Sequence, residues 1–307
     1  MRNWRLWDTK RRMSAVVISR RVFLLAAIFA YLQIALGGVV RVTGSGLGCP
    51  DWPLCHGRPY PPADLNAIIE YSHRTVGAVT GVLIIATVVA AWAVFRTRRP
   101  AVAWLATASV IAVAVEGALG GVVVVSELKP WLVAVHLGLA MIILGCLIAT
   151  AVLSMSASPG IESPSFRTLA TAAVAGTYIL LLSGSSVVAT QSDESCRSWP
   201  LCDFSSVNTF ALLHRGVALI VGVLLVVFVV AAYRRGLRLF AVATAIVLLL
   251  QVAIGGAAAV TGTALANGLH VAIATLVWSG VLTTALLAMP RVDRARAPVL
   301  QIQKTPV

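Results

Sequence analysis

The sequence predicts an all-α integral membrane protein whose eight transmembrane helices form two repeated four-helix bundles. The 307-residue chain is 59% hydrophobic and only 11% charged, whereas soluble domains carry about 25% charged residues. Uncharged runs of roughly 20 residues, long enough to cross a bilayer, recur along the whole chain. In addition, one cysteine-containing motif occurs twice, once in each half of the chain.

The uncharged runs give the positions of the expected helices. They lie at residues 22–41, 71–95, 101–125, 131–153, 167–190, 210–233, 238–260 and 265–289. The last two belong to one uncharged stretch from Leu239 to Pro290, which turn-like residues interrupt at 261–263 and 267–268. A misread interruption would reduce the count to seven helices.

The net charge of +13 is distributed unevenly along the chain. Eighteen of the 24 Lys and Arg residues lie in the two tails and in the connections after the second, fourth and sixth spans. This asymmetry follows the positive-inside rule, so we expect both termini to be cytoplasmic. The basic surface then faces anionic lipid, and nucleic acid is not expected as a partner.

The two halves of the chain repeat one another. The first outer loop contains Cys49-Pro-Asp-Trp-Pro-Leu-Cys55, and the third contains Cys196-Arg-Ser-Trp-Pro-Leu-Cys202. Downstream of each motif come two histidines, so that His73 corresponds to His214 and His136 to His270. The expected division is a cytoplasmic tail at 1–21, an N-terminal half at 22–155, a cytoplasmic linker at 156–166, a C-terminal half at 167–290 and a tail at 291–307.

A shorter repeat occupies the odd-numbered spans. Spans one, three and seven each carry a polar residue four positions before a glycine pair, and span five keeps a degenerate version: Gln33 and Gly37-Gly38, Glu116 and Gly120-Gly121, Gln251 and Gly255-Gly256, and Ser183-Gly184. The next helix always begins with one of the four histidines. Paired glycines in membranes usually mediate helix packing, but their repeated coupling to histidine favours a flat ligand between the helices. A hydrogen-bonding role suits Gln33, Glu116 and Gln251.

The four repeated histidines are the strongest candidates for a binding function. Polar side chains inside a membrane bundle are costly and usually functional. Two imidazoles from two helices can supply the opposite axial ligands of a haem iron. Zinc or copper fits less well, because each half offers two imidazoles and no nearby thiolate or second carboxylate. The fifth histidine, His56, lies in the first loop and is expected to be exposed.

The cysteines fall into two external pairs and one single residue. Cys49/Cys55 and Cys196/Cys202 lie outside the membrane, where oxidation is favoured, at a spacing that allows a disulfide within each loop. The second pair is interpreted as structural, whereas the first could be structural or redox-active. Cys146 lies in mid-helix and is interpreted as core packing.

A carboxylate distinguishes the two halves. Glu70 precedes His73 by three residues and shares its helical face, whereas Ala211 precedes His214. This difference favours chemistry in the N-terminal half and a held cofactor in the C-terminal half. The alternative is that Glu70 only interacts with the helix dipole. Three arginines at outer helix ends could contact haem propionates or anchor loops: Arg41, Arg74 and Arg215.

The stretch from Gly37 to Cys55 (GGVVRVTGSGLGCPDWPLC) resembles the first-loop signature of haem A synthases, and Glu70-x-x-His73-Arg74 and the other three histidines are similar to that family too. Cysteine pairs in both halves resemble the bacterial form. The resemblance implies oxidation of the C8 methyl group of haem O to the formyl group of haem A. It also implies that substrate haem lies between His73 and His136 with Glu70 as catalytic carboxylate, and haem b between His214 and His270.

The resemblance further implies a bacterial cell membrane protein that works with haem O synthase and cytochrome oxidase assembly factors. The electron acceptor, the source of oxygen and a homo-oligomeric state are left open. The alternative from another class is a dihaem b-type electron-transfer protein, a quinol-linked cytochrome b. Glu70 is the residue that argues against this alternative.

Overall fold

The computed structural model describes residues 2–155, 161, 163–190, 196–202 and 208–289. These residues contain eight α-helices, each with a segment long and apolar enough to cross a membrane, which confirms the expected fold class. The helices are α1 (Arg2–Val42), α2 (Leu65–Phe95), α3 (Pro100–Val125), α4 (Pro130–Ser154), α5 (Pro164–Ala189), α6 (Thr209–Arg234), α7 (Arg238–Thr261) and α8 (Ala264–Ala288). A short 3-10 helix, η1, spans Ser45–Leu47.

Of the two expected interruptions between the last two spans, the one at residues 261–263 is a true break, whereas residues 267–268 lie inside α8. Gly262 adopts a left-handed conformation with φ 59° and ends α7, because a residue without a Cβ tolerates this conformation. Thr263 then caps α8 by accepting a hydrogen bond from the backbone N–H of Ala266. The chain therefore has eight helices in the part that the structure describes.

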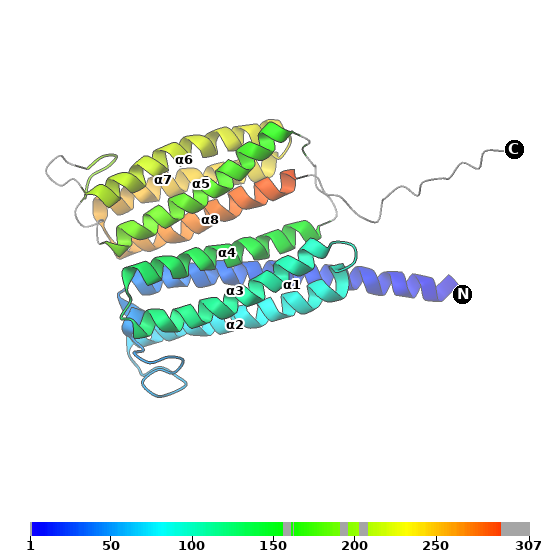
Figure 1. The fold of residues 1–307 in the computed structure, drawn as a ribbon, viewed down its shortest axis with the longest axis horizontal. Coiled ribbons are helices and arrows are strands. Elements are labelled where there is room, and N and C mark those ends of the chain that lie inside the picture. Colours follow the sequence, from blue (N-terminus) through cyan, green and yellow to red (C-terminus); the bar gives the residue numbers. More distant parts are fainter. Residues whose placement is uncertain (1, 156–160, 162, 191–195, 203–207, 290–307) are drawn as a thin grey trace.

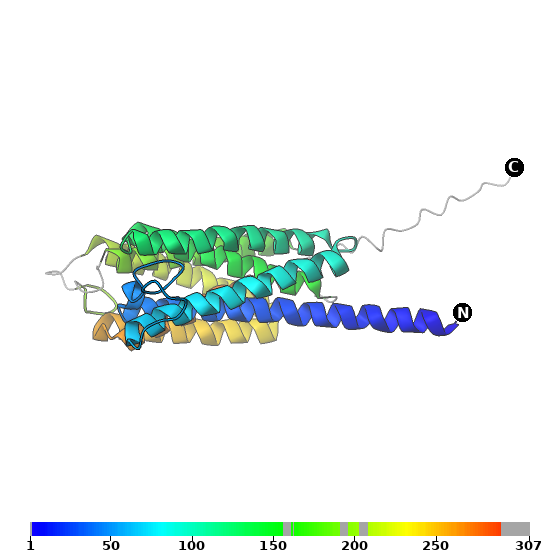
Figure 2. The same cartoon turned by 90° about the horizontal axis from the view of Figure 1, so that it is seen from below.

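The first helix begins earlier than the sequence predicted. Residues 2–21, expected as a tail, form one continuous helix with the span that follows, since Gly37 is the first glycine and no proline precedes it. Figure 2 shows α1 extending beyond the other helices at this end. The predicted linker at 156–166 lies outside the described residues except for 161 and 163–166, and the predicted tail at 291–307 lies outside them entirely.

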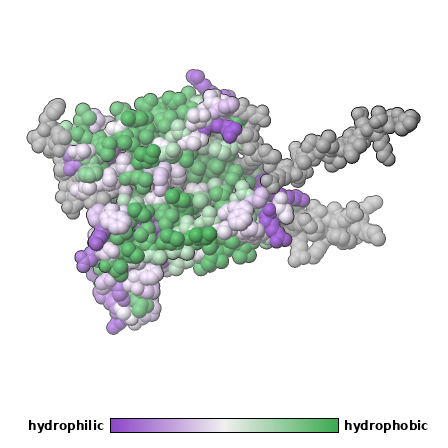
Figure 3. All heavy atoms as spheres, in the orientation of Figure 1, coloured by the Kyte–Doolittle hydropathy of each residue, from purple (hydrophilic) through white to green (hydrophobic). Residues whose placement is uncertain are grey.

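The helices form two bundles that lie side by side. Helices α1–α4 make up one bundle and α5–α8 the other (Figure 1). The bundles meet through α1, α4, α5 and α8. In α4 and in α8, half of the 18-residue apolar segment that could cross the membrane is buried, which is a larger share than in any other described helix. Hydrophobic side chains cover much of the lateral surface in Figure 3, with hydrophilic groups mostly toward the two ends.

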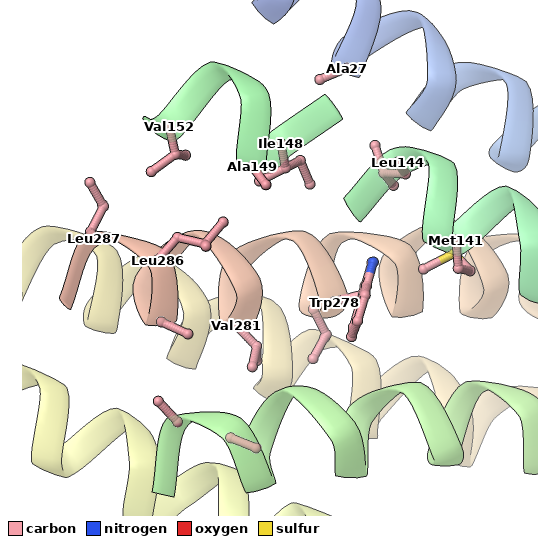
Figure 4. Close-up of a cluster of buried hydrophobic side chains, with 14 of the residues drawn as sticks. Ala27, Met141, Leu144, Ile148, Ala149, Val152, Trp278, Val281, Leu286 and Leu287 are labelled. Carbon is pink, nitrogen blue, oxygen red and sulfur yellow. The ribbon is translucent and has the colours of Figure 1, made fainter. Parts of the chain in front are cut away.

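The interface between the bundles positions two of the four candidate histidines. In a buried cluster, Met141 of α4 lies toward Trp278 of α8, and Leu286 of α8 points toward α4 (Figure 4). In a membrane such close packing, with its dispersion contacts, holds helices together. This packing fixes α4, which carries His136, relative to α8, which carries His270.

Candidate functional site

All four candidate histidines lie in the first turns of even-numbered helices and are partly buried. Each imidazole packs against a glycine of the preceding odd-numbered helix. A Cβ built on that glycine would lie close to Cε1 of the ring. The distances are 3.1 Å for Gly37 and His73, 3.3 Å for Gly120 and His136, 3.1 Å for Gly184 and His214, and 2.8 Å for Gly255 and His270. The flat group that approaches each glycine is therefore the histidine ring itself.

Each histidine also lies beside a polar side chain of the same odd-numbered helix. Gln33 Nε2 is 3.2 Å from His73 Nε2, and Gln251 Nε2 is 3.0 Å from His270 Nδ1. Ser183 Oγ lies 2.9 Å from His214 Nδ1. Glu116 Oε1 lies 3.1 Å from His136 Nδ1. The hydrogen-bonding role expected for Gln33 and Gln251 is confirmed, and the structure identifies the histidines as the neighbours.

Each half of the chain contributes two of the four histidines, namely His73 and His136 in the N-terminal half and His214 and His270 in the C-terminal half. Among the described residues, no group of three or more His, Cys, Asp and Glu side chains could hold a metal ion. Two imidazoles suit a porphyrin iron, which takes its other four ligands from the macrocycle. In the described part of the chain, Nδ1 of His73 is buried without a hydrogen-bond partner, so the donor set fits a haem.

The α1–α2 loop, residues 43–64, is fixed onto the start of α2. It contains the expected disulfide between Cys49 and Cys55, and both residues are fully buried. Arg74 Nη1 donates hydrogen bonds to the carbonyl oxygens of Asp51 and Leu54, at 2.7 and 2.6 Å, and Nη2 donates to that of Cys49 at 2.8 Å. Arg74 thus anchors the loop in this structure.

Glu70 belongs to the same network. Its side chain is buried, Oε2 accepts a hydrogen bond from the Cys49 N–H at 2.8 Å, and Oε1 accepts one from Arg74 Nη2 at 2.5 Å. The carboxylate is therefore held in one position directly beneath the disulfide loop, one helical turn from His73.

The α5–α6 loop is anchored to its helix by an arginine in a similar way, with Ala211 at the position that corresponds to Glu70. It contains the second expected disulfide, between Cys196 and Cys202. Arg215 donates to the carbonyl oxygen of Cys196 at 3.1 Å and to that of Pro200 at 3.3 Å. Ala211, the counterpart of Glu70, is buried. Among the described residues, Arg215 thus makes contacts to its loop like those of Arg74, so these arginine contacts do not by themselves require Glu70.

Two tryptophans complete the site and were not predicted from the sequence. Trp52 lies against Gly121 of α3, where an added Cβ would come within 3.0 Å of its ring, and Trp199 lies within 3.5 Å of the same point on Gly256 of α7. Both Trp–Pro bonds are cis. One sequence feature could have indicated their role: a loop Trp-Pro and a glycine pair in an odd-numbered helix occur together in both halves of the chain.

The tip of the α1–α2 loop is ordered by Asp51. Its carboxylate accepts hydrogen bonds from the backbone N–H groups of His56 at 2.6 Å and Gly57 at 2.8 Å. These two bonds hold the pKa of Asp51 below its ordinary value, and the bond from Gly57 has the larger effect. His56 is exposed, as expected, and Cys146 is partly buried in α4. Arg41 lies exposed at the end of α1.

The profile of the cytochrome oxidase assembly protein family matches residues 20–282 of this sequence. The chain belongs to this family. Among its curated relatives, a protein of Bacillus licheniformis named heme A synthase is 32% identical over 181 residues, or 56% of this chain and 60% of the relative. Relatives of the same name from Shouchella clausii and Staphylococcus epidermidis are 27% and 25% identical.

The matches differ in how much of each protein they cover. The chain spans 60% and 62% of the Bacillus licheniformis and Bacillus pumilus relatives. It spans 83% of the Shouchella clausii relative and 94% of the Staphylococcus epidermidis relative, and these two alignments include 76% and 88% of this chain. Because each of these two alignments covers well over half of the chain, each extends into both halves of the internal repeat.

Proposed function

We propose that this family member is a haem A synthase, an oxidoreductase that converts the C8 methyl group of haem O to the formyl group of haem A for cytochrome oxidase. The names of its relatives and the four paired imidazoles support this function. The observation that carries it is Glu70, a buried carboxylate one turn from His73, whose counterpart in the other half is Ala211. Haem O synthase and cytochrome oxidase assembly factors are the proposed partners.

The two halves have different roles in this proposal. Substrate haem O is held between His73 and His136, and haem b between His214 and His270. The unpartnered ring nitrogen of His73, Nδ1, supports ligation in the N-terminal half. In the C-terminal half, Ser183 and Gln251 orient the two rings. When bound there, haem b would supply one-electron transfer.

Glu70 acts on the periphery of the substrate in this proposal. Oxidation of a methyl group on a porphyrin, by successive hydroxylations through an alcohol, builds positive character on the methyl carbon and releases protons. Two donors hold Glu70, and a carboxylate fixed in this way stabilises developing positive charge without reorganising. Because both of its oxygens already accept hydrogen bonds, the structure favours this electrostatic role over proton abstraction.

The proposed site lies near the outer face of a bacterial cell membrane, with both termini in the cytoplasm. The positive-inside distribution supports this orientation. At the end of the bundles that would face the cytoplasm, Arg20 donates to the carbonyl oxygen of Ser154, and Arg99 to those of Leu153 and Met155. Both disulfides lie toward the opposite end, where an oxidising compartment would preserve them.

One observation favours the second candidate, a dihaem b-type electron-transfer protein. The Glu70 carboxylate makes two hydrogen bonds that also stabilise the α1–α2 loop, so a purely structural role would explain its position. The two candidates differ in their product. A haem A synthase yields haem A or its alcohol precursor on extraction, whereas an electron-transfer protein yields only its resident haem.

The Glu70→Gln variant tests the proposal when it is the only copy in cells that make haem O. Loss of a positioned carboxylate costs about 10²–10⁴-fold in rate, so haem O or the alcohol should accumulate while the haem b spectrum stays close to wild type. Glu127→Gln is the matched control, because Glu127 is an exposed glutamate in the α3–α4 connection. Normal haem A from Glu70→Gln would contradict the catalytic role. Loss of haem b would mean that the two halves are exchanged.

A further inference from the structure

Glu116 differs in charge from its counterpart in the other half. It occupies the position that Gln251 occupies in α7 and Gln33 in α1, four residues before a glycine that contacts a histidine. All three side chains reach that histidine. An amide is therefore sufficient to contact the ring at two of these positions, whereas α3 places a carboxylate there.

A partly buried carboxylate within a membrane-spanning helix needs a physical reason. An ionisable group within a transmembrane helix is costly, and glutamine would keep almost the same shape without a charge. In the described part of the chain, Glu116 Oε2 and His136 Nδ1 are both buried and have no hydrogen-bond partner. Since Glu116 Oε1 is 3.1 Å from that nitrogen, a small rotation of the His136 ring would direct the Nδ1–H at the Glu116 carboxylate and form a hydrogen bond.

The chemistry of metal-bound histidine explains what such a pair does. A histidine that binds iron through one ring nitrogen carries its proton on the other, and a carboxylate that accepts this N–H fixes the ring and raises the basicity of the ligand. A more basic ligand and a nearby negative charge stabilise ferric over ferrous iron, because the ferric haem carries one more positive charge. Outer hydrogen bonds of this kind tune the reduction potential of a haem.

We propose that Glu116 is a positioning residue that accepts the Nδ1–H of His136, leaves Nε2 to bind the haem iron, and lowers the reduction potential of haem in the N-terminal half. This inference rests on the proposed function, since it requires haem between His73 and His136. In the C-terminal half, the uncharged amide of Gln251 lies beside the corresponding nitrogen of His270. The two halves should therefore hold haems of different reduction potential.

The test uses purified full-length protein loaded with two equivalents of haem and titrated by spectroelectrochemistry. Glu116→Gln should shift one midpoint potential in the positive direction and leave the other unchanged. The reciprocal variant Gln251→Glu should shift the other midpoint in the negative direction, which assigns each potential to its half. Conversion of haem O by Glu116→Gln should also fall by about 10- to 100-fold.

The outcomes separate this inference from the proposed function. If Glu116→Gln retains both haems and both midpoints are unchanged, or if both shift equally, the inference is wrong, whereas conversion of haem O by the wild type would still support the function. If His73→Ala and His136→Ala leave the haem content and spectrum unchanged, the proposed substrate site fails instead. The Glu116→Gln result decides alone if Gln251→Glu proves unstable.

Discussion

Substitution of Gly255 by alanine should weaken haem binding in the C-terminal half. A Cβ at this position would lie 2.8 Å from Cε1 and 3.2 Å from Nδ1 of His270, whereas unstrained carbon atoms stay about 3.5–4.0 Å apart. The ring would have to move by about 0.7 Å or more. A metal site tolerates deviations of only about 0.2 Å in its bond lengths, and Gln251 restrains the ring further.

The expected magnitude follows from two opposing terms. Overpacking a tight contact costs about 1–3 kcal/mol, while alanine stabilises a helix by up to about 1 kcal/mol relative to glycine. Without haem the ring can tilt away, so the net effect on the fold should be small. With haem the ring is fixed by iron, and the cost appears as an affinity roughly 5- to 150-fold lower. Gly120→Ala, where the contact is 3.3 Å, should show a weaker effect in the N-terminal half.

Haem titration of the purified variants, with haem content measured as the pyridine haemochrome, checks this prediction. Gly222→Ala is the matched control, because it lies in the same half and no described atom comes within 4 Å of its added Cβ. Thermal unfolding of the haem-free proteins separates a folding defect from a binding defect. Equal haem affinity for Gly255→Ala and Gly222→Ala would refute the idea that the glycines position the histidines.

Three further predictions concern the ligands and the loops. His214→Ala or His270→Ala should remove most of the b-type low-spin spectrum, and full haem content in both variants would refute the assignment. Both disulfides should resist thiol labelling in membranes isolated without reductant, and four freely labelled loop thiols would contradict this. Because charged hydrogen bonds contribute about 1.5–3 kcal/mol each, Arg74→Gln should accelerate hydrogen exchange of residues 49–58. The weaker contacts of Arg215 predict a smaller effect of Arg215→Gln on its own loop.

Much of the fold could be predicted from the sequence, because the lipid phase imposes strict requirements on it. Backbone polar groups in a bilayer must be satisfied within the helix, so an uncharged run of sufficient length has few alternatives to a helix. The break between α7 and α8 could also be predicted, because the residues at 261–263 are typical of a turn. In the structure, Gly262 adopts a positive φ and ends α7, and Thr263 caps the start of α8. The helical state of residues 2–21 was missed, because charge patterning reports membrane exposure and not backbone conformation.

The coupling of glycine to histidine could be predicted from the sequence, but its geometry could not. A repeat shows that two positions depend on each other, yet it does not show which atoms meet. The interpretation of a flat ligand against the glycines therefore missed that the imidazole itself fills this place. Likewise, the positions of Arg74 and Arg215 in the sequence were compatible with contacts either to haem propionates or to loop carbonyl oxygens. The path of each disulfide loop brings the carbonyl oxygens to the arginines.

The duplicated fold offers a physical reason for unequal halves. Both halves hold two histidines against glycines and carry a disulfide loop, so this shared framework is what binds haem in the proposed function. The N-terminal half adds two carboxylates, Glu70 and Glu116, where the C-terminal half has Ala211 and Gln251. Because each carboxylate is costly in a membrane bundle, their concentration in one half indicates a need for negative charge there. A haem methyl group that becomes electron-deficient during oxidation creates that need, whereas a haem that only transfers electrons does not.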